Sequence, residues 1–208
     1  MGHLHTNPIP AGEVCFWGPS VTRGYFRNEE KTKETVTADG WLFSGDVCCV
    51  FSNGAMKIID RAKNIFKLSQ GEYIAPEKLE NVYIQHPMAA QVWIHGESTH
   101  DHVIMFLVVD EVAAKAWSER TGKDVASLPG DQELIQKIVD EICALADTNK
   151  FNALEKPKQL KLLLEPFSVE NDLLTPTFKL KRNVAKTRFT ADIDAMYAAP
   201  ILRPSKKK

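Results

Sequence analysis

DRAKNIFKLSQGEYIAPEKLE, residues 60–80, is the stretch around which this chain is organised. The apolar residues 56–59 just before it predict a strand, which runs into the basic side chains of Arg61, Lys63 and Lys67. Gly71 permits backbone angles that other residues avoid, so we expect a turn there. A basic strand end beside a glycine turn predicts an anion site, and an ordinary surface hairpin with solvated lysines is the alternative.

Composition describes a globular protein whose charge is unevenly spread. The 208 residues are 44% hydrophobic and 25% charged, which is enough for one or two domains with their own cores. The net charge of −1 gives no general attraction to nucleic acid. Residues 156–208 nevertheless hold 12 basic against 5 acidic residues, and residues 110–155 hold 5 against 10. This basic C-terminal quarter fits nucleotide phosphates, an anionic lipid surface or water equally well.

The cysteines and the hydropathy pattern indicate the cellular compartment in which the protein is expected. Cys15, Cys48, Cys49 and Cys143 show neither metal-binding spacing nor a disulfide framework, so we expect no metal site and a reducing compartment. No 18-residue apolar run and no signal-peptide pattern occur. We therefore expect a cytoplasmic protein, with peripheral contact to an organelle membrane left open. His3 and His5 are expected in an unstructured lead-in and not in a metal site.

The periodicities predict an α+β fold. Strands are expected over residues 13–17, 47–51 and 55–59, with a hairpin turn at residues 52–54, so the first 60 residues should form antiparallel sheet. A helix over residues 76–85 should start at Pro76, and Glu77 and Glu80 in its first turns suit the helix dipole. Further helices are expected over residues 111–120, 131–147 and 183–197, with strands over 90–95, 103–109 and 160–164. This order predicts a β-rich segment, residues 1–60, followed by a small α+β domain, residues 61–208.

Three motifs carry a family resemblance. GEVCFWGPSVTRGYF (residues 12–26) with DGWLFSGD (39–46) comes first, the segment 60–80 second and LTPTFKLKR (174–182) third. In this order they resemble the AMP-forming acyl-CoA synthetases of the adenylate-forming superfamily. The spellings GYFRNEEKT and LTPTFKLKR resemble the long-chain fatty acid branch. The resemblance covers nearly the whole chain.

The resemblance implies a ligase and assigns roles to individual residues. Such enzymes join a fatty acid to coenzyme A in two steps, in which ATP first gives an acyl-adenylate and pyrophosphate, and the thiol of coenzyme A then releases AMP. Asp46 matches the family aspartate that binds both ribose hydroxyls, although a turn aspartate is the plain alternative. Arg61 matches the family arginine that contacts ribose and phosphate, and Lys63 matches the hinge between the large domain and the lid domain. Gln70, Gly71 and Glu72 match the loop that approaches coenzyme A, and Lys179 matches the catalytic lysine of adenylation.

Two features limit this assignment. Many relatives have Ser-Gly before the catalytic lysine, where this chain has Thr177 and Phe178, and Lys179 with Lys181 and Arg182 also reads as a solvated basic cluster. The family's phosphate-binding loop and its aromatic-Gly-x-Thr-Glu motif, which holds adenine and metal, do not occur in the sequence.

The resemblance therefore implies the C-terminal portion of a long-chain fatty acid–CoA ligase: the end of the large domain (1–60) and the lid domain (61–208). The Mg²⁺ ligands should then lie in the missing large domain, and the chain should be inactive alone. An aryl-CoA ligase and a non-catalytic module that binds lipid or a protein partner are the alternatives. The sequence sets neither acyl-chain length nor oligomeric state nor organelle.

Overall fold

The computed structural model describes residues 9–205, and the chain divides into two compact units. Unit 1 comprises residues 1–65 and unit 2 residues 66–208, and each is described by itself. His3, His5 and the last three lysines lie outside the described residues. The expected domain boundary between residues 60 and 61 falls close to this division and remains a prediction.

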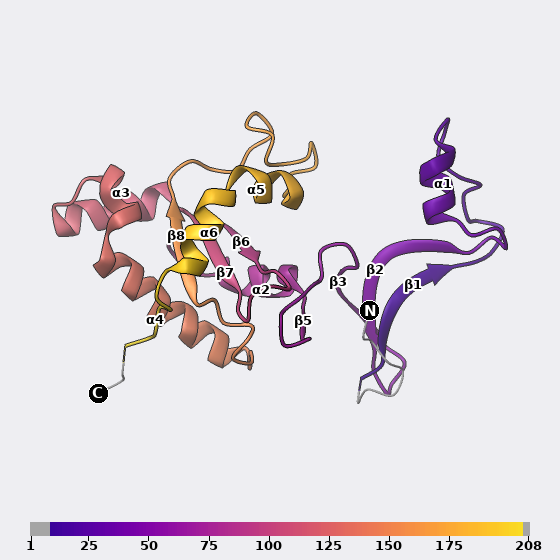
Figure 1. Ribbon diagram of the computed structural model, residues 1–208, viewed down its shortest axis with the longest axis horizontal. Coiled ribbons are helices and arrows are strands. Elements are labelled where there is room, and N and C mark those ends of the chain that lie inside the picture. Colours follow the sequence, from indigo (N-terminus) through magenta and orange to yellow (C-terminus); the bar gives the residue numbers. More distant parts are fainter. Residues whose placement is uncertain (1–8, 206–208) are drawn as a thin grey trace. The chain divides into compact units, whose positions relative to one another are not determined.

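Unit 1 is built on an antiparallel sheet, as the sequence predicts. β1 (Ala11–Phe16), β2 (Leu42–Val50) and β3 (Met56–Arg61) lie in the order β1-β2-β3. The turn between β2 and β3 contains Gly54 at φ +80°, the left-handed region that favours glycine. α1 (Glu29–Thr35) lies in the β1–β2 connection, and the Asn28 side chain caps it by accepting from Lys31 N at 2.9 Å (Figure 1).

Unit 2 has a three-stranded mixed sheet with helices on both faces. β6 (Ala89–His95), β7 (Ile104–Val109) and β8 (Gln159–Leu163) lie in that order, with β6–β7 antiparallel and β7–β8 parallel. α2 (Pro76–Tyr83), α3 (Glu111–Thr121), a 3₁₀ helix η1 (Val125–Gly130) and α4 (Gln132–Thr148) contribute to the core on one face (Figure 1). α5 (Arg182–Arg188) and α6 (Thr190–Ala198) cover the other face. The predicted α+β class is confirmed.

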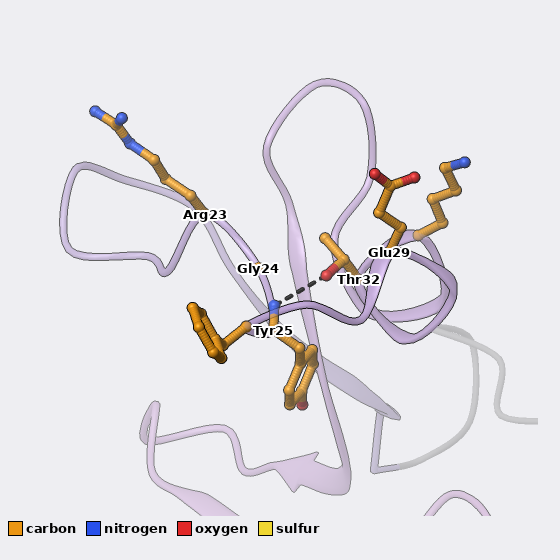
Figure 2. Close-up of a pocket in the computed structure, with 7 residues that line it drawn as sticks. Arg23, Gly24, Tyr25, Glu29 and Thr32 are labelled. Carbon is orange, nitrogen blue, oxygen red and sulfur yellow. Dashed lines mark hydrogen bonds between the residues drawn. The ribbon is translucent and has the colours of Figure 1, made fainter.

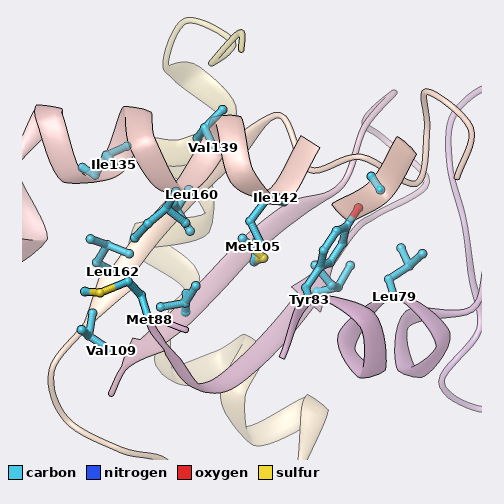
Figure 3. Packing of buried hydrophobic residues seen from close by; sticks show 14 of the residues in the cluster. Leu79, Tyr83, Met88, Met105, Val109, Ile135, Val139, Ile142, Leu160 and Leu162 are labelled. Atoms are coloured by element: carbon cyan, nitrogen blue, oxygen red, sulfur yellow. The ribbon is translucent and has the colours of Figure 1, made fainter. Parts of the chain in front are cut away.

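The central strand β7 divides two hydrophobic cores. All six of its residues are buried, because neighbouring side chains on a strand point to opposite faces and both faces are covered. Met105 and Leu107 face the core under α2 and α4, which Figure 3 shows from close by. Ile104 and Phe106 face the smaller core under α5 and α6. On α4 the predicted apolar face is confirmed: Leu134, Ile138 and Ile142 are buried, and Leu145 packs against them.

Two parts of unit 2 differ from the sequence prediction. β4 (Phe66–Lys67) and β5 (Tyr73–Ile74) form a short hairpin closed by the glycine turn, in a stretch where a surface hairpin is the alternative prediction, without bounds for its strands. The single last helix expected over residues 183–197 is wrong, because α5 and α6 are separated at Phe189, whose φ of −101° and ψ of 18° are not helical. The Phe189 ring packs among Trp93, Phe106 and Phe167, so tertiary packing interrupts the helix.

Candidate functional site

Asp46 and Arg61 lie side by side on neighbouring strands of unit 1. They are direct register partners on β2 and β3, and Arg61 Nε donates to Asp46 Oδ1 at 3.2 Å. The same guanidinium reaches the carbonyl of Ser44 at 3.4 Å. Both side chains are half exposed, at 54% for Arg61 and 41% for Asp46, so they stay accessible to a ligand. The antiparallel register thus joins two residues that lie in separate motifs of the sequence.

A groove of about 470 Å³ opens beside Arg61. Arg61, Lys63 and Lys31 bring positive charge to its lining, and Glu13 and Glu34 bring negative charge. Gly45, at φ +76°, also lines the groove, and its N–H donates to Glu13 Oε1 at 2.9 Å. The groove thus offers cations to an anionic ligand, while the Gly45 N–H is already bonded to Glu13.

Lys63 lies in an exposed turn that ends β3. The turn is closed by hydrogen bonds from Asn64 N and Ile65 N to Arg61 O, at 2.9 and 3.2 Å. It is also tied to β2, because Ala62 N donates to Gly45 O at 2.7 Å. Unit 1 ends at residue 65, directly after this turn. The hinge role of Lys63 remains a prediction.

Gln70, Gly71 and Glu72 form the turn of the β4–β5 hairpin in unit 2. Gly71 has φ +94°, as the sequence predicts, and its N–H donates to Leu68 O at 2.9 Å. Leu68 N in turn donates to Glu72 O at 2.9 Å, and the Leu68 side chain is buried. Gln70 is tied to the β6–β7 connection, because its Nε2 donates to the carbonyl of Asp101 at 2.8 Å. Gln70 and Glu72 are nevertheless exposed, and Gly71 between them is half-buried.

Lys179 lies on a tightly closed loop before α5. Thr175 N donates to Lys179 O at 2.8 Å, Lys179 N donates to Thr175 Oγ1 at 3.1 Å, and Phe178 N donates to Thr175 O at 2.8 Å. Phe178 adopts a left-handed φ of 59°, which is strained for a bulky residue. Lys179 is exposed, and its Nζ makes no ion pair with any residue that the structure describes. Lys181, by contrast, is paired with Asp172.

A bidentate ion pair fixes the end of this loop. Arg182, the first residue of α5, donates from its two terminal nitrogens to the two carboxylate oxygens of Glu80 on α2, at 2.8 and 2.6 Å. Glu80 Oε1 also accepts from Ile94 N on β6 at 2.8 Å. Both side chains are largely buried, with 18% of Arg182 and 15% of Glu80 exposed. We call this ion pair the Arg182–Glu80 clamp. The sequence pattern indicated only an interaction of Glu80 with the helix dipole and gave no sign of its contact with Arg182.

A second pocket of unit 1, of about 500 Å³, is formed by the GYFRNEEKT motif (Figure 2). Thr32 Oγ1 accepts from Tyr25 N at 2.9 Å, which holds α1 against the chain before it. A side chain at Gly24 would place its Cβ 2.5 Å from Thr32, so glycine is required there. Arg23 extends away from Thr32. The arrangement accounts for the glycine structurally and brings no reactive groups together.

The described residues contain no cluster of three or more His, Cys, Asp or Glu side chains placed to hold a metal ion. Within the same residues no helix has the length and apolarity needed to cross a membrane. All four cysteines are free thiols; Cys48 is buried and Cys49 half-buried.

Comparisons with known proteins find relatives in sequence and in fold. No protein-family model matches the chain. It is 42% identical to the Arabidopsis thaliana protein named long chain acyl-CoA synthetase 7, peroxisomal, over 92% of this chain and 28% of the relative. It is 43% identical to fatty acyl-CoA synthetase A of Dictyostelium discoideum, over 95% of this chain and 31% of that protein. The A-PCP didomain of carboxylic acid reductase from Segniliparus rugosus, solved with AMP, superposes with a TM-score of 0.81 at 29% identity, over 95% of this chain and 26% of that one.

These matches define the class of protein as adenylate-forming, in sequence and in fold. Within that class, the relatives that share 42–43% identity with the chain are acyl-CoA synthetases, and the chain spans about 28–31% of the length of these relatives.

Proposed function

We propose that the chain acts as the C-terminal part of a long-chain fatty acid–CoA ligase, which converts fatty acid, ATP and coenzyme A into acyl-CoA, AMP and pyrophosphate. The observation that carries the proposal is the identity of 42–43% to acyl-CoA synthetases over 92–95% of this chain. Long-chain fatty acid is preferred over an aryl acid because the matched relatives are named for fatty or long-chain acyl groups.

In the first half-reaction, the groups of unit 1 bind the nucleotide. Asp46 offers carboxylate oxygens to the ribose hydroxyls, and Arg61, hydrogen-bonded to it, presents further N–H donors toward ribose and phosphate. Lys179 stabilises the negative charge that develops at the α-phosphate as pyrophosphate departs. Its exposed position without a described ion pair suits this role better than the paired Lys181 does. We place the Mg²⁺ ligands outside this chain.

In the second half-reaction, the turn Gln70–Gly71–Glu72 approaches coenzyme A. Its glycine leaves space for close backbone contact. Lys63, in the turn that ends unit 1, is the position where backbone angles change between the two half-reactions.

We propose a cytoplasmic location, with at most weak peripheral contact to a membrane. Many cations of the basic C-terminal quarter already have acidic partners, and this leaves fewer of them to bind anionic lipid. These cations are Lys156, Lys161, Lys181, Arg182, Lys186 and Arg188. Liposome pelleting at varied salt tests this, since binding to anionic vesicles should be weak and lost as salt rises.

The test of the proposed function is a chimera. The segment of Dictyostelium fatty acyl-CoA synthetase A that this chain matches is replaced by the chain, with the parent enzyme and the truncated parent as controls. Formation of palmitoyl-CoA by the chimera, absent from the truncated parent, is the expected result. A folded chimera that forms neither acyl-adenylate nor acyl-CoA would refute the proposal.

Within the chimera, Lys179→Ala should lower the rate of pyrophosphate release about 10²–10³-fold, because a donor to the transition state is lost. Thioester formation from pre-made acyl-adenylate should change only a few-fold. Lys181→Ala is the matched control and should leave adenylation largely intact. If Lys181→Ala shows the adenylation defect and Lys179→Ala does not, the motif register is wrong.

A further inference from the structure

The turn Gln70–Gly71–Glu72 is hydrogen-bonded to the β6–β7 loop, residues 96–103. Ser69 N donates to His100 O at 2.9 Å, and Gln70 Nε2 donates to the next carbonyl, Asp101 O, at 2.8 Å. Two consecutive carbonyls of one loop thus fix two consecutive residues of the other. A small displacement of residues 100–101 would move the turn with them.

The base of the hairpin contacts the same loop. The Phe66 ring lies against Gly96, where an added Cβ would come within 2.3 Å of Phe66 Cε2. Gly96 is buried, so neither group can move aside without disturbing the core. The hairpin and the β6–β7 loop therefore behave as one body.

The C-terminal helix α6 in turn holds the β6–β7 loop. The His100 and Tyr197 rings are stacked, with centroids 3.6 Å apart and planes 5° from parallel. Burial raises the pKa of Tyr197, so its hydroxyl stays protonated and donates to His102 O, at 3.3 Å. Tyr197 thus contacts the loop on both sides of Asp101, whose carbonyl receives Gln70. Asp101 and His102 are themselves joined, Asp101 Oδ1 to His102 Nδ1, at 2.6 Å.

We propose that the His100–Tyr197 stack is a positioning device for the thioester-forming half-reaction. It fixes the carbonyls of residues 100 and 101, these carbonyls fix the turn Gln70–Gly71–Glu72, and the turn would meet coenzyme A. The inference rests on the proposed function for the role of the turn. The link from α6 to the turn rests on the contacts above alone. The described contacts of His100 and Tyr197 lead to the turn, so both are assigned a positioning role.

Amide exchange in the 208-residue chain tests the link without any activity. Ser69 N–H reports directly on its bond to His100 O. His100→Ala removes the stack, and His100→Phe keeps an aromatic ring against Tyr197. Exchange at Ser69 measured by NMR should be at least about tenfold faster in His100→Ala and close to the unsubstituted chain in His100→Phe. Unchanged exchange in His100→Ala, with the stack gone, would overturn the proposal.

The half-reactions of the chimera test the consequence. His100→Ala should lower kcat/KM for coenzyme A about 10- to 100-fold, since a misplacement on the order of 1 Å can have this effect. Pyrophosphate release should stay within about twofold, and His100→Phe should recover the thioester step. Equal loss in both half-reactions would show a general structural defect and overturn the proposal. An inactive chimera with the unsubstituted chain would instead refute the proposed function, and the exchange experiment then decides the link by itself.

Discussion

The Arg182–Glu80 clamp gives a sharp test of what stabilises unit 2. Arg182→Met removes the guanidinium and leaves the Glu80 carboxylate largely buried, with 15% of the side chain exposed. Its one remaining partner among the clamp contacts is Ile94 N, at 2.8 Å. Loss of one partner of a fully buried pair costs about 3–5 kcal/mol, and the residual exposure reduces our expectation to about 2–4 kcal/mol.

A second substitution separates the buried charge from the lost packing. Glu80→Gln on top of Arg182→Met keeps an oxygen for Ile94 N and removes the charge, so the double variant should be more stable than Arg182→Met alone. Additive destabilisation by the two substitutions would refute the reasoning, because it would mean that no unpaired charge had been buried.

Urea unfolding followed by tryptophan fluorescence measures these differences. Trp93 and Trp117 are buried in unit 2, whereas Trp17 and Trp41 of unit 1 are exposed. A Trp17→Phe, Trp41→Phe background therefore confines the signal to unit 2. A cost below about 1 kcal/mol for Arg182→Met would show that the clamp does not stabilise the unit.

Three further predictions follow from the site and the buried histidine. The isolated chain should make no detectable acyl-CoA from palmitate, ATP and coenzyme A, and turnover by pure chain would contradict its role as part of a larger ligase. Lys63→Pro in the chimera fixes φ at the hinge and should impair one half-reaction much more than the other, whereas equal loss would make Lys63 merely structural. His86 accepts from Met88 N at 3.1 Å and contacts Glu141, itself paired with Lys137, and burial lowers its pKa. Protonation thus favours the unfolded chain, so stability should be fully present above about pH 6.5 and fall below it, with a shallower fall in His86→Gln.

Local patterns were sufficient wherever the chain is regular. The period of α4, the glycine turn at residue 71 and the β2–β3 hairpin follow from residue spacing and turn chemistry. The break at Phe189 could not be predicted in this way, because neither glycine nor proline marks it. It arises from an aromatic cluster whose members come from β6, β7 and the chain before α5.

The candidate site shows the same limit. Motif resemblance identified Asp46 and Arg61 separately, and only the strand register shows that they touch. Glu80 looked like a dipole partner because its spacing within α2 is visible in sequence, while its bond to Arg182 spans 102 residues. No local sequence pattern identifies His100 or Tyr197 as positioning residues. Their proposed role depends on tertiary contacts: the stacking of the two rings and the hydrogen bond from Tyr197 to His102 O.

The left-handed Phe178 has a consequence for the entropy of the Lys179 loop. Phenylalanine holds a positive φ here at a cost of about 1–3 kcal/mol, which the hydrogen bonds to Thr175 must offset. A phenylalanine has far fewer backbone states than a glycine, so fewer conformations compete with the closed loop. The backbone beneath Lys179 is thus ordered when the protein folds, and in the adenylation step that we propose, only the side chain of this lysine would remain to be immobilised.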